Sequence, residues 1–159
     1  MVDTGDTAPE FSAPLANGDL GETFVLVERL EEAPIVLAFF PGAFSSVCTG
    51  EMRTFQDRLG AFADAGASVY GVSVDSPFAL NAFREDSGLE YDLISDPNHD
   101  VVDAYDVGMG FDALGIDEVA KRAVFVVDGD GTITYAWESD DPGVEPDYDE
   151  VEAAARDAA

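Results

Sequence analysis

Apolar residues in this chain fall into short continuous runs separated by segments with helical spacing. The runs at 35–40 and 68–74 are largely apolar, which predicts strands covered on both faces of a sheet. Between them, apolar side chains recur every three or four residues over 52–62, which predicts one helix with a buried stripe that ends near Gly66. The positions of this stripe are Met52, Phe55, Leu59 and Phe62.

The remaining elements are shorter and are predicted from turn and capping residues. Ser76 before Pro77 is a helix-start signal, and 128–131 separates β-rich runs at 124–127 and 132–137, as in a hairpin. Further predicted elements are a turn at Asn17-Gly18, strands at 24–27 and 92–96, a short helix with Val101, Val102 and Tyr105, and a helix at 148–158. This alternation is typical of an α/β fold with a mixed central sheet flanked by helices.

Composition indicates a folded chain rather than a disordered one. The 159 residues are 47% hydrophobic, and no linker or repeat divides residues 1–159, so a single domain is expected. No apolar run approaches the ~20 residues needed to span a bilayer. The first six residues lack the basic and apolar regions of a signal peptide, so a cytoplasmic protein is expected.

The charge balance is strongly acidic, with 34 acidic residues against 7 basic ones and a formal net charge of -27. Nucleic acids and anionic membranes would be repelled and are not expected as partners. The acidic residues are spread along the chain, and their mutual repulsion would be screened at molar salt, where the Debye length is about 3 Å. This pattern favours a protein adapted to a high-salt, halophilic cytoplasm. The alternative is an ordinary acidic soluble protein.

Cys48 is the only cysteine, so no disulfide can form within the chain. It follows the predicted strand at 35–40 and the turn Pro41-Gly42, and it therefore lies in the first turn of the next helix. The unpaired N–H groups and the dipole at a helix N-terminus favour the reactive thiolate. The alternative is that Cys48 is a small buried apolar residue.

Other polar groups are candidates to act with this thiol. Ser45 lies about one turn before Cys48, and the turn at 41–46 could direct N–H groups at an anion. A guanidinium stays charged and donates to two atoms at once, which makes Arg122, just before the strand at 124–127, the candidate cation. The alternatives are a capping role for Ser45 and a surface ion pair for Arg122.

The spacing of Pro41, Ser45 and Cys48 resembles the active-site motif of the peroxiredoxins, Pro-x-x-x-Thr/Ser-x-x-Cys. The residues around it, 40–45 and 48–51, are most similar to the one-cysteine AhpE-like branch, near the bacterioferritin-comigratory-protein group. The likeness extends to residues 5–11, 95–99 and 122–128, and so covers nearly the whole chain.

The resemblance implies a thioredoxin-like fold and a thiol peroxidase that reduces hydrogen peroxide or organic hydroperoxides without a metal or organic cofactor. It implies that Cys48 is the peroxidatic nucleophile and that Ser45, which replaces the threonine of many members, binds the peroxide through its hydroxyl. It further implies that Pro41 shields the thiolate and that Arg122 activates it. Because no second cysteine exists, an external thiol or a thioredoxin- or glutaredoxin-like reductant is the expected partner.

Several points stay open in the sequence. A non-enzymatic redox sensor shares the first chemical step with a peroxidase, whereas a thioredoxin-type oxidoreductase is disfavoured because no Cys-x-x-Cys pair is present. Glu51 is interpreted as a complement to the helix dipole and His99 as a surface or capping residue, with no functional role assigned to either. The family resemblance also suggests a homodimer with apolar contacts from Phe44 and Phe78.

Overall fold

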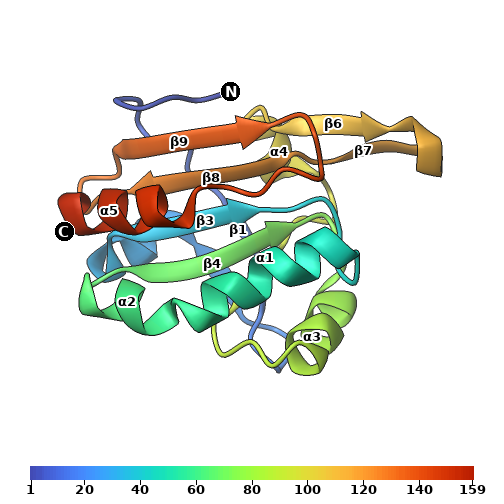
Figure 1. The fold of residues 1–159 in the computed structure, drawn as a ribbon, viewed down its shortest axis with the longest axis horizontal. Helices are drawn as coiled ribbons and strands as arrows, with labels where there is room; N and C mark the ends of the chain where they lie inside the picture. The colour runs from blue at the N-terminus through green and yellow to red at the C-terminus, as the bar shows by residue number, and fades with distance from the viewer.

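A mixed seven-stranded sheet with helices on both faces forms the centre of the computed structural model, which describes residues 1–159 (Figure 1). Its strands are β1 (Ser12–Ala16), β2 (Thr23–Val25), β3 (Ile35–Phe39), β4 (Ser68–Ser73), β5 (Leu93–Ser95), β8 (Arg122–Val127) and β9 (Ile133–Ser139). They lie in the order β2-β1-β5-β4-β3-β8-β9. The pairs β3–β4 and β4–β5 are parallel and the other pairs are antiparallel, which confirms the predicted α/β fold with a mixed sheet.

Two apolar cores lie on opposite faces of this sheet. The helices are α1 (Ser46–Asp57), α2 (Leu59–Asp64), α3 (Pro77–Asp86), α4 (Asp100–Ala104) and α5 (Tyr148–Ala158), with a 3-10 helix η1 (Leu26–Glu32). Alternate residues of a strand point to opposite faces. In β3, Val36 and Ala38 therefore belong to the core formed with α1, α2, α3 and α5. Leu37 and Phe39 belong to the other core, which includes Val101 of α4.

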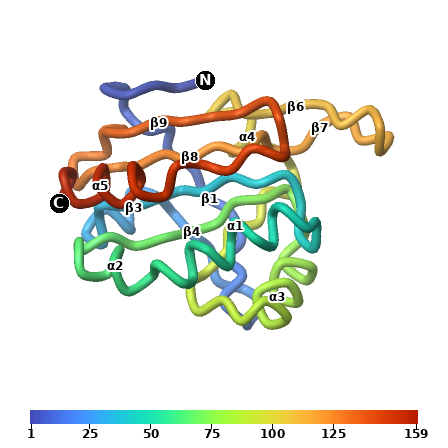
Figure 2. Tube along the Cα trace, in the orientation of Figure 1, coloured from blue at the N-terminus to red at the C-terminus, as the bar shows by residue number.

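A second, two-stranded unit projects beyond the main sheet. It consists of β6 (Gly108–Phe111) and β7 (Ile116–Ala120), which pair antiparallel, with the short 3-10 helix η2 (Asp112–Leu114) at its tip. Figure 2 shows these residues, 108–120, extending away from the body of the molecule, and they are called the arm below. The sequence patterns predicted no element here.

Most predicted elements are confirmed, but the helix predicted over 52–62 is interrupted. α1 ends at Asp57 and α2 begins at Leu59, and Arg58 between them has φ -98° and ψ 4°. The side chain of Arg58 forms ion pairs with Asp149 and Glu152 of α5, at 2.8 and 3.1 Å. The apolar spacing continues across this break, so hydrophobic periodicity alone could not reveal it.

The predicted strand at 24–27 is shorter in the structure than in the sequence pattern. β2 ends at Val25, and the chain then turns into η1 because the N–H of Val27 donates to the carboxylate of Glu10 at 3.0 Å instead of to a strand. The helix start at Ser76 is confirmed, since its Oγ accepts a hydrogen bond from the N–H of Ala79 at 3.2 Å. No helix is long and apolar enough to cross a membrane.

Candidate active site around Cys48

The connection from β3 to α1 positions Cys48. β3 ends at Phe39, the chain turns through a loop in which Phe44 has φ +68°, and α1 begins at Ser46. Cys48 is the third residue of this helix, and only 1% of it is exposed. Its neighbours in the apolar core include Met52, so the thiol lies at the edge of the core rather than on the surface.

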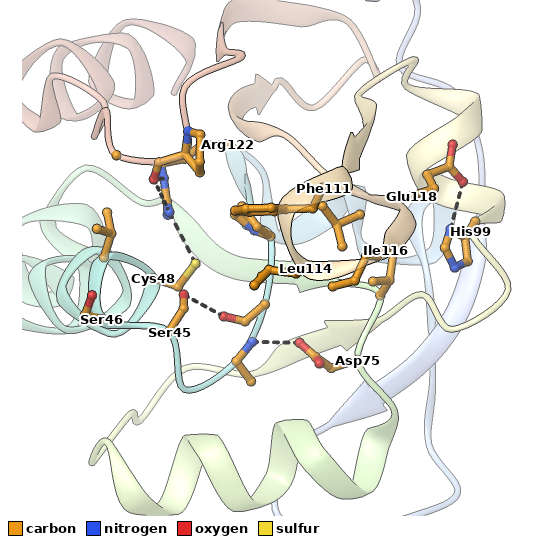
Figure 3. A pocket seen from close by; sticks show the side chains of 18 residues that line it. Ser45, Ser46, Cys48, Asp75, His99, Phe111, Leu114, Ile116, Glu118 and Arg122 are labelled. Atoms are coloured by element: carbon orange, nitrogen blue, oxygen red, sulfur yellow. Dashed lines mark hydrogen bonds and ion pairs between the residues drawn. The ribbon is translucent and has the colours of Figure 1, made fainter.

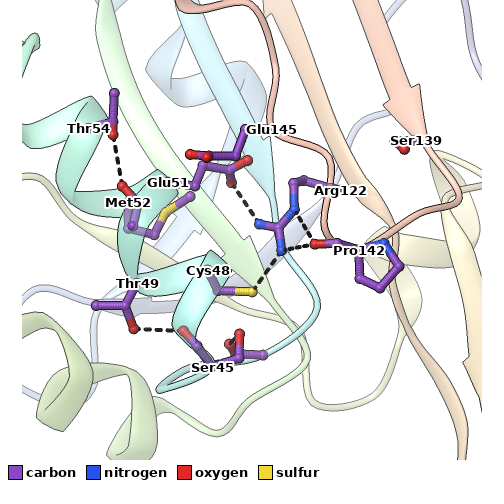
Figure 4. A network of polar contacts seen from close by, with 12 residues as sticks. Ser45, Cys48, Thr49, Glu51, Met52, Thr54, Arg122, Ser139, Pro142 and Glu145 are labelled. Carbon is purple, nitrogen blue, oxygen red and sulfur yellow. Dashed lines mark hydrogen bonds and ion pairs between the residues drawn. The ribbon is translucent and has the colours of Figure 1, made fainter. Parts of the chain in front are cut away.

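The register between β3 and β8 brings Arg122 to this thiol. Phe39 at the end of β3 pairs with Ala123, so Arg122 at the start of β8 lies next to the loop that leads into α1. Its Nη2 donates to the Sγ of Cys48 at 3.3 Å, and only 1% of the arginine is exposed (Figure 4). Cys48 and Arg122 are 74 residues apart in the sequence, and the pairing of β3 with β8 brings them together.

Two further groups hold the guanidinium in place (Figure 4). The carbonyl oxygen of Pro142 accepts hydrogen bonds from Nε at 3.1 Å and from Nη2 at 2.8 Å. On the other side, Oε1 of Glu51 lies 3.5 Å from Nη1, but neither carboxylate oxygen forms a hydrogen bond. Glu51 is fully buried, so the interpretation that it only complements the helix dipole is wrong.

Burial sets the charge states of this group. Burial raises the pKa of Glu51 to about 8, although the nearby Arg122 opposes the shift. Burial alone would lower the pKa of Arg122, but the adjacent Glu51 and Cys48 outweigh this effect and leave the pKa above its ordinary value. The arginine therefore stays charged near neutral pH, whereas burial disfavours the charged form of Glu51. The guanidinium thus faces the sulfur with Nη2 and the Glu51 carboxyl with Nη1.

The loop before α1 is fixed by hydrogen bonds that leave Ser45 at the surface of the site. The N–H of Ala43 donates to Oδ2 of Asp75 at 2.8 Å, and the hydroxyl of Ser45 donates to the carbonyl of Gly42 at 3.1 Å (Figure 3). Ser45 precedes α1 as its N-cap residue but makes no capping hydrogen bond, so the capping interpretation is wrong. The lone pairs of its oxygen remain free to accept.

A pocket of about 660 Å³ opens in front of the sulfur and is lined by all four residues predicted for the site: Pro41, Ser45, Cys48 and Arg122. Its walls also include Asp75 and His99, and the arm closes one side (Figure 3). His99 has φ +66°, and its Nδ1 lies 2.7 Å from Oε1 of Glu118 in β7. No group of three or more histidine, cysteine or acidic side chains is arranged to hold a metal ion.

Sequence reasoning missed three contributors to the site, for different reasons. Glu51 follows Cys48 by three residues on α1, so its place on the same helix face was readable from the spacing. Pro142 contributes a backbone carbonyl, and a residue pattern cannot predict such a contact. Asp75 acts through a loop N–H more than thirty residues away, which only the parallel pairing of β3 and β4 brings within reach.

The mixed sheet of this order with flanking helices is a thioredoxin-like fold, and it holds a single thiol against an arginine at the start of a helix. The comparisons with known proteins identify the family. The model of the AhpC/TSA family matches residues 4–136. The chain therefore belongs to the AhpC/TSA family of peroxiredoxins, which are thiol peroxidases, and the expected family and enzyme class are confirmed.

Individual relatives agree with this assignment. The chain is 31% identical over 141 residues to peroxiredoxin Bcp of Bacillus subtilis, covering 86% of this chain and 85% of that protein. It is 34% identical over 142 residues to a chloroplastic 2-cysteine peroxiredoxin of Chattonella marina, covering 85% and 70%. The crystal structure of peroxidoxin BcpB from Mycobacterium tuberculosis superimposes with a TM-score of 0.85 at 28% identity, covering 100% of this chain and 99% of that one.

Proposed function

We propose that this peroxiredoxin reduces peroxides through Cys48 and depends on an external thiol to restore it. The contact between Cys48 and Arg122 carries the proposal: Nη2 lies 3.3 Å from Sγ, and both groups are buried at the end of an open pocket. A charged guanidinium at this distance stabilises a thiolate, which is the nucleophilic form of cysteine.

The first step oxidises the cysteine. The Cys48 thiolate attacks the terminal oxygen of the peroxide, an S–O bond forms, and the O–O bond breaks. Cys48 becomes a sulfenic acid, and the other oxygen leaves as hydroxide or alkoxide and takes up a proton to give water or an alcohol. Arg122 stabilises the negative charge that develops on the two oxygens, because its guanidinium is already in place.

The surrounding residues orient the peroxide. The hydroxyl of Ser45 donates to Gly42, so its oxygen accepts the hydrogen bond of the peroxide O–H. The N–H groups at the start of α1 add positive potential near the sulfur. Pro41 is buried beside the pocket and shields the thiolate from water.

The second step needs a thiol from outside the chain, because Cys48 is the only cysteine. A low-molecular-weight thiol or a thioredoxin- or glutaredoxin-like protein attacks the sulfenic acid, releasing water and forming a mixed disulfide. A second thiol then releases Cys48 and a disulfide product. Steady-state peroxide consumption with a panel of such thiols tests this step. Consumption that stops after one equivalent with every thiol would instead favour a redox sensor.

The surface charge supports a role in a high-salt cytoplasm. Of the 34 acidic residues, only Glu51 and Asp96 are buried, so nearly all the negative charge faces solvent. Such a surface repels itself at low ionic strength and is screened at molar salt. It also repels nucleic acids and anionic membranes.

A homodimer is part of the proposal because two aromatic side chains near the active-site loop are solvent-exposed. Phe44 is 55% exposed and Phe78 is 70% exposed, which is unusual for phenylalanine. Pairing through these residues would bury both rings. Light scattering in molar KCl measures the mass directly, and a monomer mass would remove the dimer from the proposal.

A further inference from the structure

The pocket in front of Cys48 is much larger than hydrogen peroxide requires. Its volume of about 660 Å³ lies within the range of sites for small organic ligands, roughly 300–1,000 Å³. Hydrogen peroxide has two heavy atoms, and a single water molecule accounts for about 30 Å³ of liquid. Most of the pocket would therefore remain filled with water if hydrogen peroxide were the substrate for which it is shaped.

The side of the pocket formed by the arm is apolar. Phe111, Leu114, Ile116 and Val119 line it, and Figure 3 shows the first three on the same side of the cavity as one another. Leu114 is 66% exposed and Ile116 is 38% exposed, although both are apolar. Exposed apolar side chains that gather at a pocket mark a binding surface.

The arm is held in place rather than left free. The two strands pair with each other, and Glu118 of β7 reaches His99 beside α4 at 2.7 Å. Gly108 leaves open the space in which this carboxylate lies, since a Cβ there would overlap it. The backbone N–H of Lys121 also donates to the carbonyl of Val107 at 2.6 Å. The apolar wall is therefore formed before a ligand enters.

The charges around the pocket disfavour an anionic ligand. Asp75 and Glu118 contribute carboxylates to its lining, and His99 is paired with Glu118. Arg122 is the only arginine or lysine in the lining, and it is already bonded to Cys48 and Pro142. With a formal net charge of -27 on the whole chain, a neutral ligand is favoured over a carboxylate-bearing one.

We propose that the arm is a specificity surface that binds the apolar part of neutral organic hydroperoxides, so that bulky alkyl or aryl hydroperoxides are preferred over hydrogen peroxide. This inference rests on the proposed peroxidase function of Cys48. The chemical step is unchanged: sulfur bonds to the terminal oxygen, the O–O bond breaks, and the alkoxide takes a proton and leaves as an alcohol. The hydrocarbon part of that alkoxide lies against Leu114 and Ile116 throughout.

The test compares rate constants for oxidation of Cys48 in single-turnover experiments in molar KCl. The substrates are hydrogen peroxide, tert-butyl hydroperoxide and cumene hydroperoxide, which increase in apolar size. The variant combines Leu114→Asn with Ile116→Thr, both at exposed positions where folding tolerates a polar residue. Leu20→Asn is the control, because Leu20 is 58% exposed and does not line the pocket.

We expect the ratio of the cumene hydroperoxide constant to the hydrogen peroxide constant to fall about 10-fold in the double variant, the scale of losing one buried aliphatic side chain. The hydrogen peroxide constant itself should change less than about 2-fold, and Leu20→Asn should match the unaltered protein. The decrease for tert-butyl hydroperoxide should be intermediate.

Two outcomes would overturn the inference while leaving the peroxidase function intact. One is an unchanged ratio in the double variant. The other is a change of mass in light scattering, together with an equal loss of rate for all three substrates, which would assign the apolar residues to contacts between copies of the chain. Failure of every peroxide to oxidise Cys48 in the unaltered protein would instead refute the proposed function, and the inference with it.

Discussion

The two ends of the active-site pocket place their residues in opposite ways. At the inner end, the thiol of Cys48 and the ionisable side chains of Arg122 and Glu51 are almost fully buried. At the outer end, apolar Leu114 and Ile116 are exposed. Soluble proteins usually bury apolar residues and expose charged ones. Both exceptions adjoin the same cavity, which supports the proposed division between chemistry at the inner end and recognition at the outer end.

The two ends also differ in what supports them. Arg122 is fixed by strand pairing in the main sheet and by hydrogen bonds to Pro142, so it cannot move without disturbing the core. The arm is a separate pair of strands, tied to the body by the ion pair between Glu118 and His99 and by Ala120, which is buried in the core at the base of β7. Substitutions at the inner end should therefore affect every peroxide, while substitutions in the arm should change only the preference among peroxides.

The largest effect is expected at the sulfur itself. Cys48→Ser should abolish peroxide consumption, because no other thiol exists in the chain and a serine hydroxyl is not ionised near neutral pH. The circular dichroism spectrum should be unchanged, since the substitution is nearly isosteric. Turnover of the variant above the buffer rate, with any of the three peroxides, would show that the inner end does not perform the reaction.

The next largest effect is expected for the cation. Arg122→Ala should slow oxidation of Cys48 by roughly 10²-fold or more, the scale of losing one preorganised donor, and by a similar factor for each peroxide. Arg122→Lys should restore part of the rate, because lysine keeps the charge but lacks the planar fork.

Arg53→Ala provides a matched control for the arginine variant. Arg53 lies on α1 like Cys48, but its side chain is exposed and forms none of the ion pairs of the chain. Its loss changes the net charge by the same amount, and the rate should stay within about 2-fold. Equal rates for the two alanine variants would mean that the cation acting on the thiolate lies elsewhere.

The parts of the fold could be predicted from the sequence to different extents. The strands at 35–40 and 68–74 could be predicted because a strand buried on both faces is largely apolar along its length. The arm was not, because Gly108 and Gly110 interrupt its pattern and much of it faces solvent. A pair of strands that lies mostly outside the core leaves only a weak alternation in the sequence.

The site likewise contains residues that the sequence could predict and contacts that it could not. Ser45 and Cys48 were identified because they lie within one turn of chain and share a motif. Arg122 was proposed from its residue type and family position, but its contact with Cys48 depends on the register of β3 against β8. Glu51 was underestimated because its spacing from Cys48 does not show that its side chain is fully buried beside a guanidinium.

A smaller effect is expected for Glu51, and it concerns stability rather than rate. Burial raises the pKa of Glu51 to about 8, whereas the unfolded chain would release this proton near pH 4.5. Between these values the folded state binds more protons than the unfolded state, so its stability falls as pH rises from about 5 to about 8. Glu51→Gln cannot release a proton and should lose this dependence.

The measurement is the midpoint of thermal unfolding across this pH range in molar KCl. Relative to Glu51→Gln, the unaltered protein should lose roughly 1 kcal/mol or more between pH 5 and pH 8. Asp57→Asn on the exposed face of α1 is the control and should follow the unaltered protein. Parallel pH curves for all three proteins would show that Glu51 does not carry a buried proton.

The smallest effect on the chemistry is expected from salt. A salt series distinguishes the acidic surface, which should respond to salt, from the buried contact between Arg122 and Cys48, which should not. The unfolding midpoint should rise steeply from millimolar to molar KCl, because the exposed acidic residues repel one another until counterions screen them. The contact between Arg122 and Cys48 is buried, so salt screens it little, and hydrogen peroxide is neutral, so salt does not steer its approach. The rate constant for Cys48 oxidation by hydrogen peroxide, measured where the protein remains folded, should therefore change less than about 2-fold across the same series.

A variant with several exposed acids changed to Asn or Gln should show a flatter rise of the midpoint at an unchanged rate constant. If its midpoint responds to KCl as strongly as that of the unaltered protein, surface repulsion is not what salt relieves, and the halophilic interpretation fails.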